Sequence, residues 1–100
     1  MAGQQLQAGR QGLLRLLSEV HDISTMEHLF RLMFTKEEQR ALAHRYLIVG
    51  ELIQSGKSQR AISADLQVSI SKITRGSTSL KEADDEFKKI LLQHYTKPDA

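Results

Sequence analysis

Apolar residues recur along the chain at intervals of three and four, a spacing that places them on one face of an α-helix. No stretch shows the strict alternation of apolar and polar residues that is typical of a strand. Stripes of the helical kind lie in residues 13–20, 26–33, 42–53, 58–66, 69–76 and 87–95. The pattern therefore predicts an all-α fold of six helices.

Polar residues and glycine mark where several of these helices begin and end. Ser24 followed by Glu27, and Thr35 followed by Glu38, have the capping-box pattern of a helix start. Gly76 is expected to stop the fifth helix. Residues 1–9 carry little apolar surface, and we expect them to form a flexible N-terminal tail. The remaining residues, 10–96, are predicted to form a single helical domain.

The amino-acid composition indicates that the protein assembles with a second copy of itself. One hundred residues are enough for one domain, but with 40% apolar residues, 5% aromatic residues and no Trp the core of a monomer would be thin. The apolar stripes are wide for so small a bundle, notably those containing Leu13, Leu17, Phe30 and Leu91. Small domains often compensate for a thin core by oligomerising. We therefore expect a homodimer with substantial burial between the chains.

Residues 58–76 have the pattern of a helix-turn-helix. Ser58 and Ser69 can each cap a short helix, and residues 66–68 form a turn between them. Gln67 stands where this turn usually needs a residue that tolerates positive φ, most often Gly. Four apolar side chains can pack the two helices together: Ile62, Leu66, Val68 and Ile73.

The second of these helices presents polar and basic side chains that suit DNA bases and phosphates. Between Lys57 and Lys81 the local charge is +4, and an acidic run over residues 82–86 follows it. A basic face beside an acidic one is expected where one face meets phosphate, whereas the acidic run suits the start of the last helix. Two other interpretations remain open, a helix pair in another all-α bundle and a helical protein–protein adaptor whose basic face is incidental.

Several runs of residues resemble the bacterial tryptophan repressor family over roughly residues 26–95. The most specific run is Ile-Thr-Arg-Gly-Ser at residues 73–77, which follows a Ser-Gln-Arg helix start at residues 58–60. The others are Ile-Val at 48–49, Glu-Leu at 51–52 and Ser-Leu-Lys at 79–81. The resemblance implies an intertwined, six-helix homodimer that binds operator DNA when L-tryptophan is bound as corepressor. Such a repressor would control tryptophan biosynthesis genes.

The resemblance also implies a site for L-tryptophan. Arg75 would pair with the ligand carboxylate, and Arg45 would lie flat against the indole. Gly76 would border the other side of the indole, and Thr35 would hydrogen-bond near the carboxylate. The ligand amino group would meet Ser79 and the main-chain carbonyls of Leu32 and Phe34.

The same resemblance assigns contacts to DNA. Arg60 would reach a base edge, and Ile70 and Ser71 would face bases, partly through water. We expect Lys72 to reach a phosphate, because its long side chain can extend past the ligand. The remaining phosphate contacts would come from Gln59, Thr74 and Ser77.

Three positions depart from the family pattern. Leu47 and Ser63 stand where basic residues are usual, and Lys72 stands where a small hydroxyl residue is common. The first two changes remove possible contacts to DNA, while Lys72 either adds one or crowds the ligand. A relative that binds DNA without tryptophan, or with another effector, therefore remains an alternative.

Other classes of protein find little support in the sequence. The chain has no Cys, and His21, His28, His44 and His94 lack ligand spacing, so we expect no metal and no cofactor beyond the corepressor. No nucleophile–base motif or phosphate-binding glycine loop is visible, which argues against an enzyme. No signal peptide or membrane-spanning stretch is visible, so a cytoplasmic protein is expected.

Overall fold

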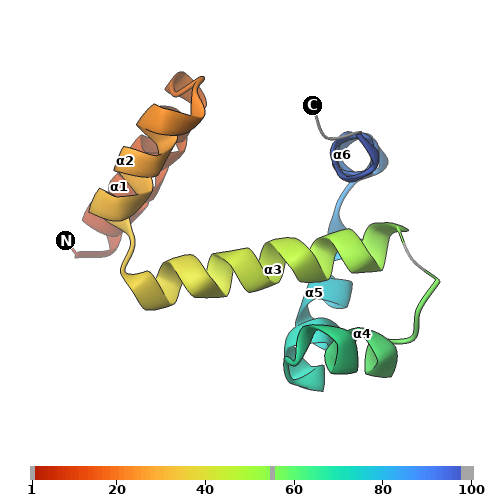
Figure 1. Cartoon of the computed structure of the whole chain (residues 1–100). Helices are drawn as coiled ribbons and strands as arrows, with labels where there is room; N and C mark the ends of the chain where they lie inside the picture. Colours follow the sequence, from red (N-terminus) through yellow and green to blue (C-terminus); the bar gives the residue numbers. More distant parts are fainter. Residues whose placement is uncertain (1, 55, 98–100) are drawn as a thin grey trace. The chain divides into compact units, whose positions relative to one another are not determined.

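The computed structural model describes residues 2–54 and 56–97, and all regular secondary structure in these ranges is helical (Figure 1). The helices are α1 (Ala2–Glu19), α2 (Ile23–Met33), α3 (Lys36–Gln54), α4 (Gln59–Leu66), α5 (Ile70–Glu82) and α6 (Asp85–Thr96). The prediction of an all-α fold with six helices is confirmed. Within the described residues, none of the helices is both long and apolar enough to cross a membrane.

By contacts the chain divides into two compact units, Met1–Gln39 and Arg40–Ala100, which are described separately below. The prediction of one domain over residues 10–96 stays a prediction. In the first unit, α1 begins at Ala2, so a helix replaces the flexible tail predicted for residues 1–9 wherever these are described. Ala, Gln and Leu dominate residues 4–8 and are good helix formers, which explains the difference.

The caps of the first unit correct one prediction and confirm another. Asp22 caps α2, because its carboxylate accepts hydrogen bonds from the Thr25 amide and hydroxyl, so the predicted cap at Ser24 is wrong. The box at the start of α3 is confirmed. The Glu38 amide donates to Thr35 Oγ1 at 3.1 Å, and the Thr35 amide donates to Glu38 Oε1 at 2.9 Å.

A small apolar cluster holds the second unit together. Ile48 from α3, Ile62 from α4 and Ile73 from α5 are at most 2% exposed, and Val68 in the intervening turn is also buried. Leu52 and Leu66 pack against this cluster. All four residues predicted to join the two short helices therefore lie together, and Ile48 ties them to α3.

The turn between α4 and α5 bends through Gln67, whose φ of 55° and ψ of 46° are left-handed. This confirms that a residue other than Gly occupies the strained position. Ser63 supports the turn twice, because its carbonyl accepts from the Val68 amide at 3.2 Å and its hydroxyl donates to the Val68 carbonyl. A small polar side chain at position 63 thus serves the turn.

Helix α5 does not stop at Gly76 but continues to Glu82, so that prediction is wrong. Gly76 has no positive φ, and its role is to allow close packing. A Cβ atom there would lie 3.0 Å from Ile48 Cγ2 and 3.3 Å from Leu52 Cδ1. The missing side chain lets α5 approach α3, a requirement that the neighbouring sequence does not reveal.

An aromatic cluster of Tyr46, His94 and Tyr95 joins α6 to α3. The Tyr95 hydroxyl donates to the Tyr46 carbonyl at 2.6 Å, and the Tyr46 hydroxyl is hydrogen-bonded to His94 Nε2 at 2.8 Å. Burial, with a smaller contribution from Tyr46, raises the pKa of the Tyr95 hydroxyl. Gly50 makes this contact possible, because a Cβ atom there would lie 2.6 Å from Tyr95 Cε1.

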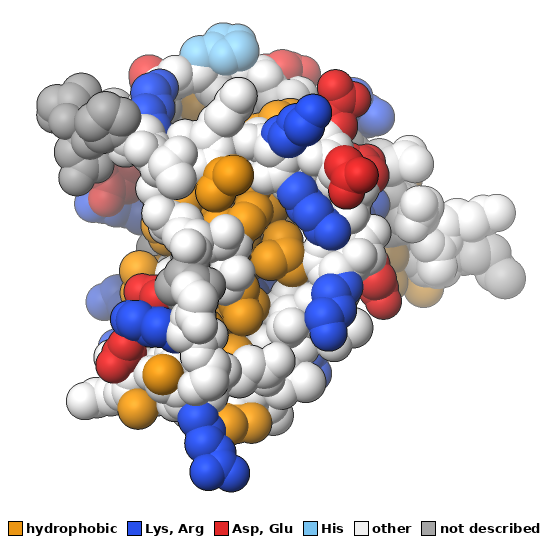
Figure 2. All heavy atoms as spheres, turned by 90° about the vertical axis from the view of Figure 1, so that its right-hand side faces the viewer, with side chains coloured by type: hydrophobic (Ala, Val, Ile, Leu, Met, Phe, Trp, Pro, Cys, Tyr) orange, Lys and Arg blue, Asp and Glu red, His pale blue; other side chains and the backbone are white. Residues whose placement is uncertain are grey.

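Both units also expose large hydrophobic side chains. Figure 2 shows such side chains at the surface of the face it draws, among Lys and Arg side chains. In the first unit they are Leu6, Leu14, Leu16, Ile23, Leu32 and Met33. In the second unit they are Tyr46, Leu47, Ile70, Phe87, Ile90 and Leu92.

The Gly50 contact leads to a stability prediction. We expect Gly50→Ala to lower the free energy of unfolding by about 1–2 kcal/mol, because the Tyr95 ring must shift and lose its hydrogen bond. Gly9→Ala, at an open position of α1, should instead raise it by about 0.5–1 kcal/mol through helix propensity. Urea denaturation of both variants checks the signs. Equal stabilisation by the two substitutions would contradict the packing role of Gly50.

Candidate ligand pocket and nucleic-acid interface

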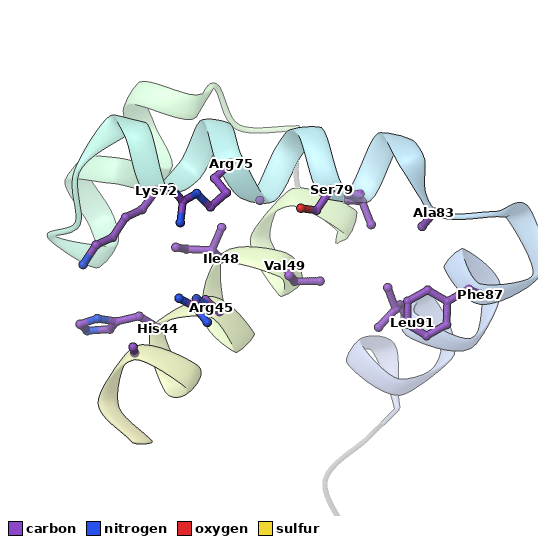
Figure 3. Close-up of a pocket in the computed structure, with 13 residues that line it drawn as sticks. His44, Arg45, Ile48, Val49, Lys72, Arg75, Ser79, Ala83, Phe87 and Leu91 are labelled. Atoms are coloured by element: carbon purple, nitrogen blue, oxygen red, sulfur yellow. The ribbon is translucent and has the colours of Figure 1, made fainter. Parts of the chain in front are cut away.

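A pocket of about 510 Å³ opens in the second unit among α3, α5 and α6 (Figure 3). Its basic side chains are His44 and Arg45 from α3 and Lys72 and Arg75 from α5. Its apolar side chains come from all three helices, and they are Ala41, Ile48, Val49, Leu80, Ala83, Phe87 and Leu91. Gly76 and Ser79 complete the lining. The pocket thus offers cationic groups together with apolar walls.

Helical spacing explains why residues of each helix meet at the pocket. Arg45 and Val49 are four residues apart on α3, so they share one face. Lys72, Arg75 and Ser79 recur at intervals of three and four along α5 and form the opposing face. The apolar cluster around Ile48 and Ile73 packs α5 on α3, which sets these two faces against each other.

The structure brings together four of the seven residues that the sequence predicted for the ligand. Arg45, Arg75, Gly76 and Ser79 all line the pocket. The other three belong to the first unit and are not among the lining residues. They are Leu32, near the end of α2, Phe34, its C-cap, and Thr35, just before α3.

Two of these first-unit groups already make internal hydrogen bonds. The Phe34 carbonyl accepts from Gln39 Nε2 at 3.0 Å, and Thr35 Oγ1 accepts from the Glu38 amide. Neither bond saturates the group, because a carbonyl has a second lone pair and a hydroxyl can still donate. Both groups therefore retain hydrogen-bonding capacity for a ligand.

The pocket is electropositive. No Asp or Glu lines it, and within the described ranges none of Arg45, Lys72 and Arg75 is within ion-pair distance of a carboxylate. Lys57 differs, because it pairs with Glu51 at 3.6 Å and with Asp65 at 2.7 Å. The hydrogen bond to Asp65 raises the pKa of Lys57. Unpaired cations beside apolar walls suit an organic anion, since charge-assisted hydrogen bonds favour its carboxylate.

Sequence reasoning missed most of the pocket lining, and three of the missed residues, His44, Phe87 and Leu91, show why. His44 precedes Arg45 and lies four residues before Ile48, so the helical period already placed it on the buried side of α3. Phe87 and Leu91 are four residues apart on α6, and they were read only as part of an apolar stripe. The spacing of Phe87 and Leu91 indicates that they share one face of α6, but it does not indicate which helices this face packs against.

The predicted DNA-contacting residues lie in the first turn of α4 and in α5 from its start as far as Ser77. The Ala61 amide donates to Ser58 Oγ at 3.1 Å, and the Lys72 amide donates to Ser69 Oγ at 3.4 Å, which confirms both predicted caps. The Thr74 hydroxyl donates to Gln59 Oε1 at 2.9 Å and so links the two helices. The exposed members of the set are Arg60, Ile70, Ser71, Lys72 and Thr74, while Gln59 and Ser77 are half-buried.

Two turn-linked helices with an exposed polar face, packed beside a cationic pocket, are the arrangement expected of a small helical regulator. Comparison with known proteins shows which family of regulators the chain resembles. The Trp repressor protein family matches residues 8–95. The chain therefore belongs to the Trp repressor family, a family of regulators rather than enzymes.

Individual relatives cover most of the chain. A Trp operon repressor homolog of Chlamydia trachomatis serovar D is 37% identical over 87% of this chain and 93% of its own length. One from Vibrio cholerae is 40% identical over 83% of this chain and 81% of its own. A third, from Vibrio vulnificus, is 43% identical over 73% of this chain and 74% of its own length. These matches confirm the family resemblance seen in the sequence.

Proposed function

We propose that the protein is a homodimeric repressor that binds operator DNA when L-tryptophan occupies the pocket, and that it controls tryptophan biosynthesis genes. One observation carries this proposal. Arg45 on α3 and Arg75 on α5 line one pocket, and neither has an ion-pair partner among the described residues. Helix α5 also carries the exposed face that is proposed to meet DNA.

The chemistry of the pocket suits an aromatic amino acid. Arg75 can hold the carboxylate bidentately, and Arg45 can stack on the indole for about 0.5–2 kcal/mol. Ser79 can accept a hydrogen bond from the ammonium. The carbonyls of Leu32 and Phe34 lie near the C-terminal end of α2, where the helix dipole favours a cation. The family resemblance assigns these carbonyls and the Thr35 hydroxyl to the ligand as well, and this assignment stays a prediction.

The turn-linked helices α4 and α5 are proposed to act as a helix-turn-helix that reads DNA. Arg60 in the first turn of α4 would contact a base edge, and Ile70 and Ser71 at the start of α5 would face bases. Phosphates would be held by Gln59, Lys72, Thr74 and Ser77. A ligand between α3 and α5 would favour the orientation of α5 that fits DNA, which couples the two binding events.

A relative of this family with another effector is the second candidate function. It is favoured by Lys72, which lines the pocket beside Arg75 and adds a cation that a zwitterionic amino acid does not need. A titration of the free protein with L-tryptophan separates the two candidates, because the chain has no Trp and the ligand's fluorescence has no protein background.

The first prediction concerns assembly. Among the described residues only Leu29, Ile48, Ile62, Val68 and Ile73 form the buried apolar core, which is small for a stable chain of this length. The half-buried stripes that contain Leu13, Leu17, Phe30 and Leu91 remain available to a second copy. Sedimentation velocity at micromolar concentration should show a dimer. A fully folded monomer under these conditions would refute the assignment.

The second prediction concerns the ligand. Arg75→Ala should abolish most tryptophan binding and with it the tryptophan-dependent gain in DNA affinity, because the carboxylate loses its bidentate partner. Lys81→Ala removes one charge from the same helix outside the pocket and should leave tryptophan affinity unchanged. Calorimetry of both variants measures this difference. Wild-type tryptophan affinity in Arg75→Ala would show that the ligand site is wrongly placed.

The third prediction concerns base reading. Arg60→Ala should cost about 1–3 kcal/mol of operator affinity and relax the preference at one base position in each half-site. Fluorescence anisotropy with operator DNA and with random DNA of equal length checks this. An equal loss on both duplexes would make Arg60 a phosphate contact instead.

A further inference from the structure

The pocket contains more cationic and hydrogen-bonding groups than one carboxylate needs. In the proposed function Arg75 holds the carboxylate and Arg45 stacks on the indole, so neither Lys72, which was assigned only to a DNA phosphate, nor His44 has a role toward the ligand. Figure 3 shows the Lys72 ammonium and the His44 ring at the same end of the pocket, away from Phe87 and Leu91. The lining therefore has a basic end and an apolar end.

The charges at the basic end call for an anion. Lys72 and Arg75 are three residues apart on α5, so two like charges share one helix face. Neither has an ion-pair partner among the described residues, and no carboxylate lines the pocket. Both side chains are exposed, so a ligand in the pocket displaces only part of their water, and an anionic group on the ligand can replace that water with charge-assisted hydrogen bonds. L-Tryptophan is a zwitterion with no net charge, so it does not balance Lys72.

We infer that Lys72 and His44 form a second anion subsite in this pocket, which binds an anionic oxygen group other than the carboxylate held by Arg75. Lys72 supplies a flexible ammonium, and an imidazole N–H of His44 can donate a hydrogen bond in either protonation state. The inference rests on the proposed function, because it takes Arg75 as the partner of the first carboxylate. The second anion comes either from a further acidic group on the effector or from a backbone phosphate of bound DNA.

The first arm of the test asks whether the free protein prefers a ligand with two carboxylates. The probes are N-(indole-3-acetyl)glycine and N-(indole-3-acetyl)-L-aspartate, which differ by one carboxymethyl group. If the effector supplies the second anion, calorimetry should show the aspartate conjugate binding roughly three- to tenfold more tightly. This advantage should disappear in Lys72→Gln and shrink in His44→Gln. Lys89→Gln, which removes one charge from α6 outside the pocket, should retain it.

The second arm asks whether DNA supplies the anion. In that case the two conjugates should bind equally. Instead, Lys72→Gln should weaken binding to all duplexes at saturating L-tryptophan and reduce the slope of log affinity against log salt by roughly one per contact. His44→Gln should weaken DNA binding in the same way with a smaller change of slope, and Lys89→Gln again serves as the control.

The inference is overturned if the conjugates bind equally and Lys72→Gln changes neither DNA affinity nor the salt slope more than Lys89→Gln does. It is also overturned if Lys72→Gln tightens tryptophan binding with an intact salt slope, because Lys72 would then merely crowd the pocket. A failure of the proposed function looks different. The wild type would then bind DNA equally with and without L-tryptophan. The ratio of the affinities for the two conjugates, and the effect of Lys72→Gln on the salt slope, would still show whether the second anion subsite exists.

Discussion

The packing of Ile48, Ile62, Val68 and Ile73 is the constraint on which the second unit depends. Each side chain is branched at Cβ, so it has few rotamers and fixes the elements that it joins. Truncating one buried Ile to Ala typically costs about 2–5 kcal/mol, against a total stability of about 5–15 kcal/mol for a small protein. So few buried residues leave little reserve, and the position of α5 on α3 depends on this cluster.

The same packing creates the pocket. Ile48 lies against Gly76 in the apolar contact between α3 and α5, and Arg45 and Arg75 flank this contact at the edge of the two helices. The cluster holds the helices close enough for both guanidinium groups to line one cavity. The stability of the unit and the proposed ligand binding therefore depend on one contact. A change at Ile48 would alter the distance between the two Arg side chains as well as the stability of the unit.

Helix α5 connects the proposed ligand and the proposed DNA site. Its buried side carries Ile73, its pocket side carries Arg75, and its exposed start carries Ile70 and Ser71. A rigid helix cannot rotate at one of these sides without rotating at the others. In the proposed function, this geometry lets a ligand far smaller than the protein control the presentation of the DNA-reading surface.

Local features of the fold could be predicted from the sequence, whereas close contacts between helices could not. Ser58 and Ser69 were predicted as caps because a cap involves only the next three residues. The prediction that Gly76 ends a helix was wrong, because this glycine leaves room for the side chain of Ile48, which lies twenty-eight residues earlier in the chain. In the pocket, the family resemblance paired Arg45 with Arg75, which no spacing rule could do. His44 was missed because the resemblance assigns it no role.

The most direct test of the account is the affinity of the protein for DNA from its own upstream region and from tryptophan-biosynthesis promoters, measured by fluorescence anisotropy with and without L-tryptophan. Random DNA of equal length and composition serves as the reference. The proposed function predicts specific, salt-dependent binding that L-tryptophan strengthens by about 1–3 kcal/mol, the usual range of allosteric coupling, which is roughly a 5- to 150-fold change in affinity. Specific binding that is identical with and without L-tryptophan would contradict it.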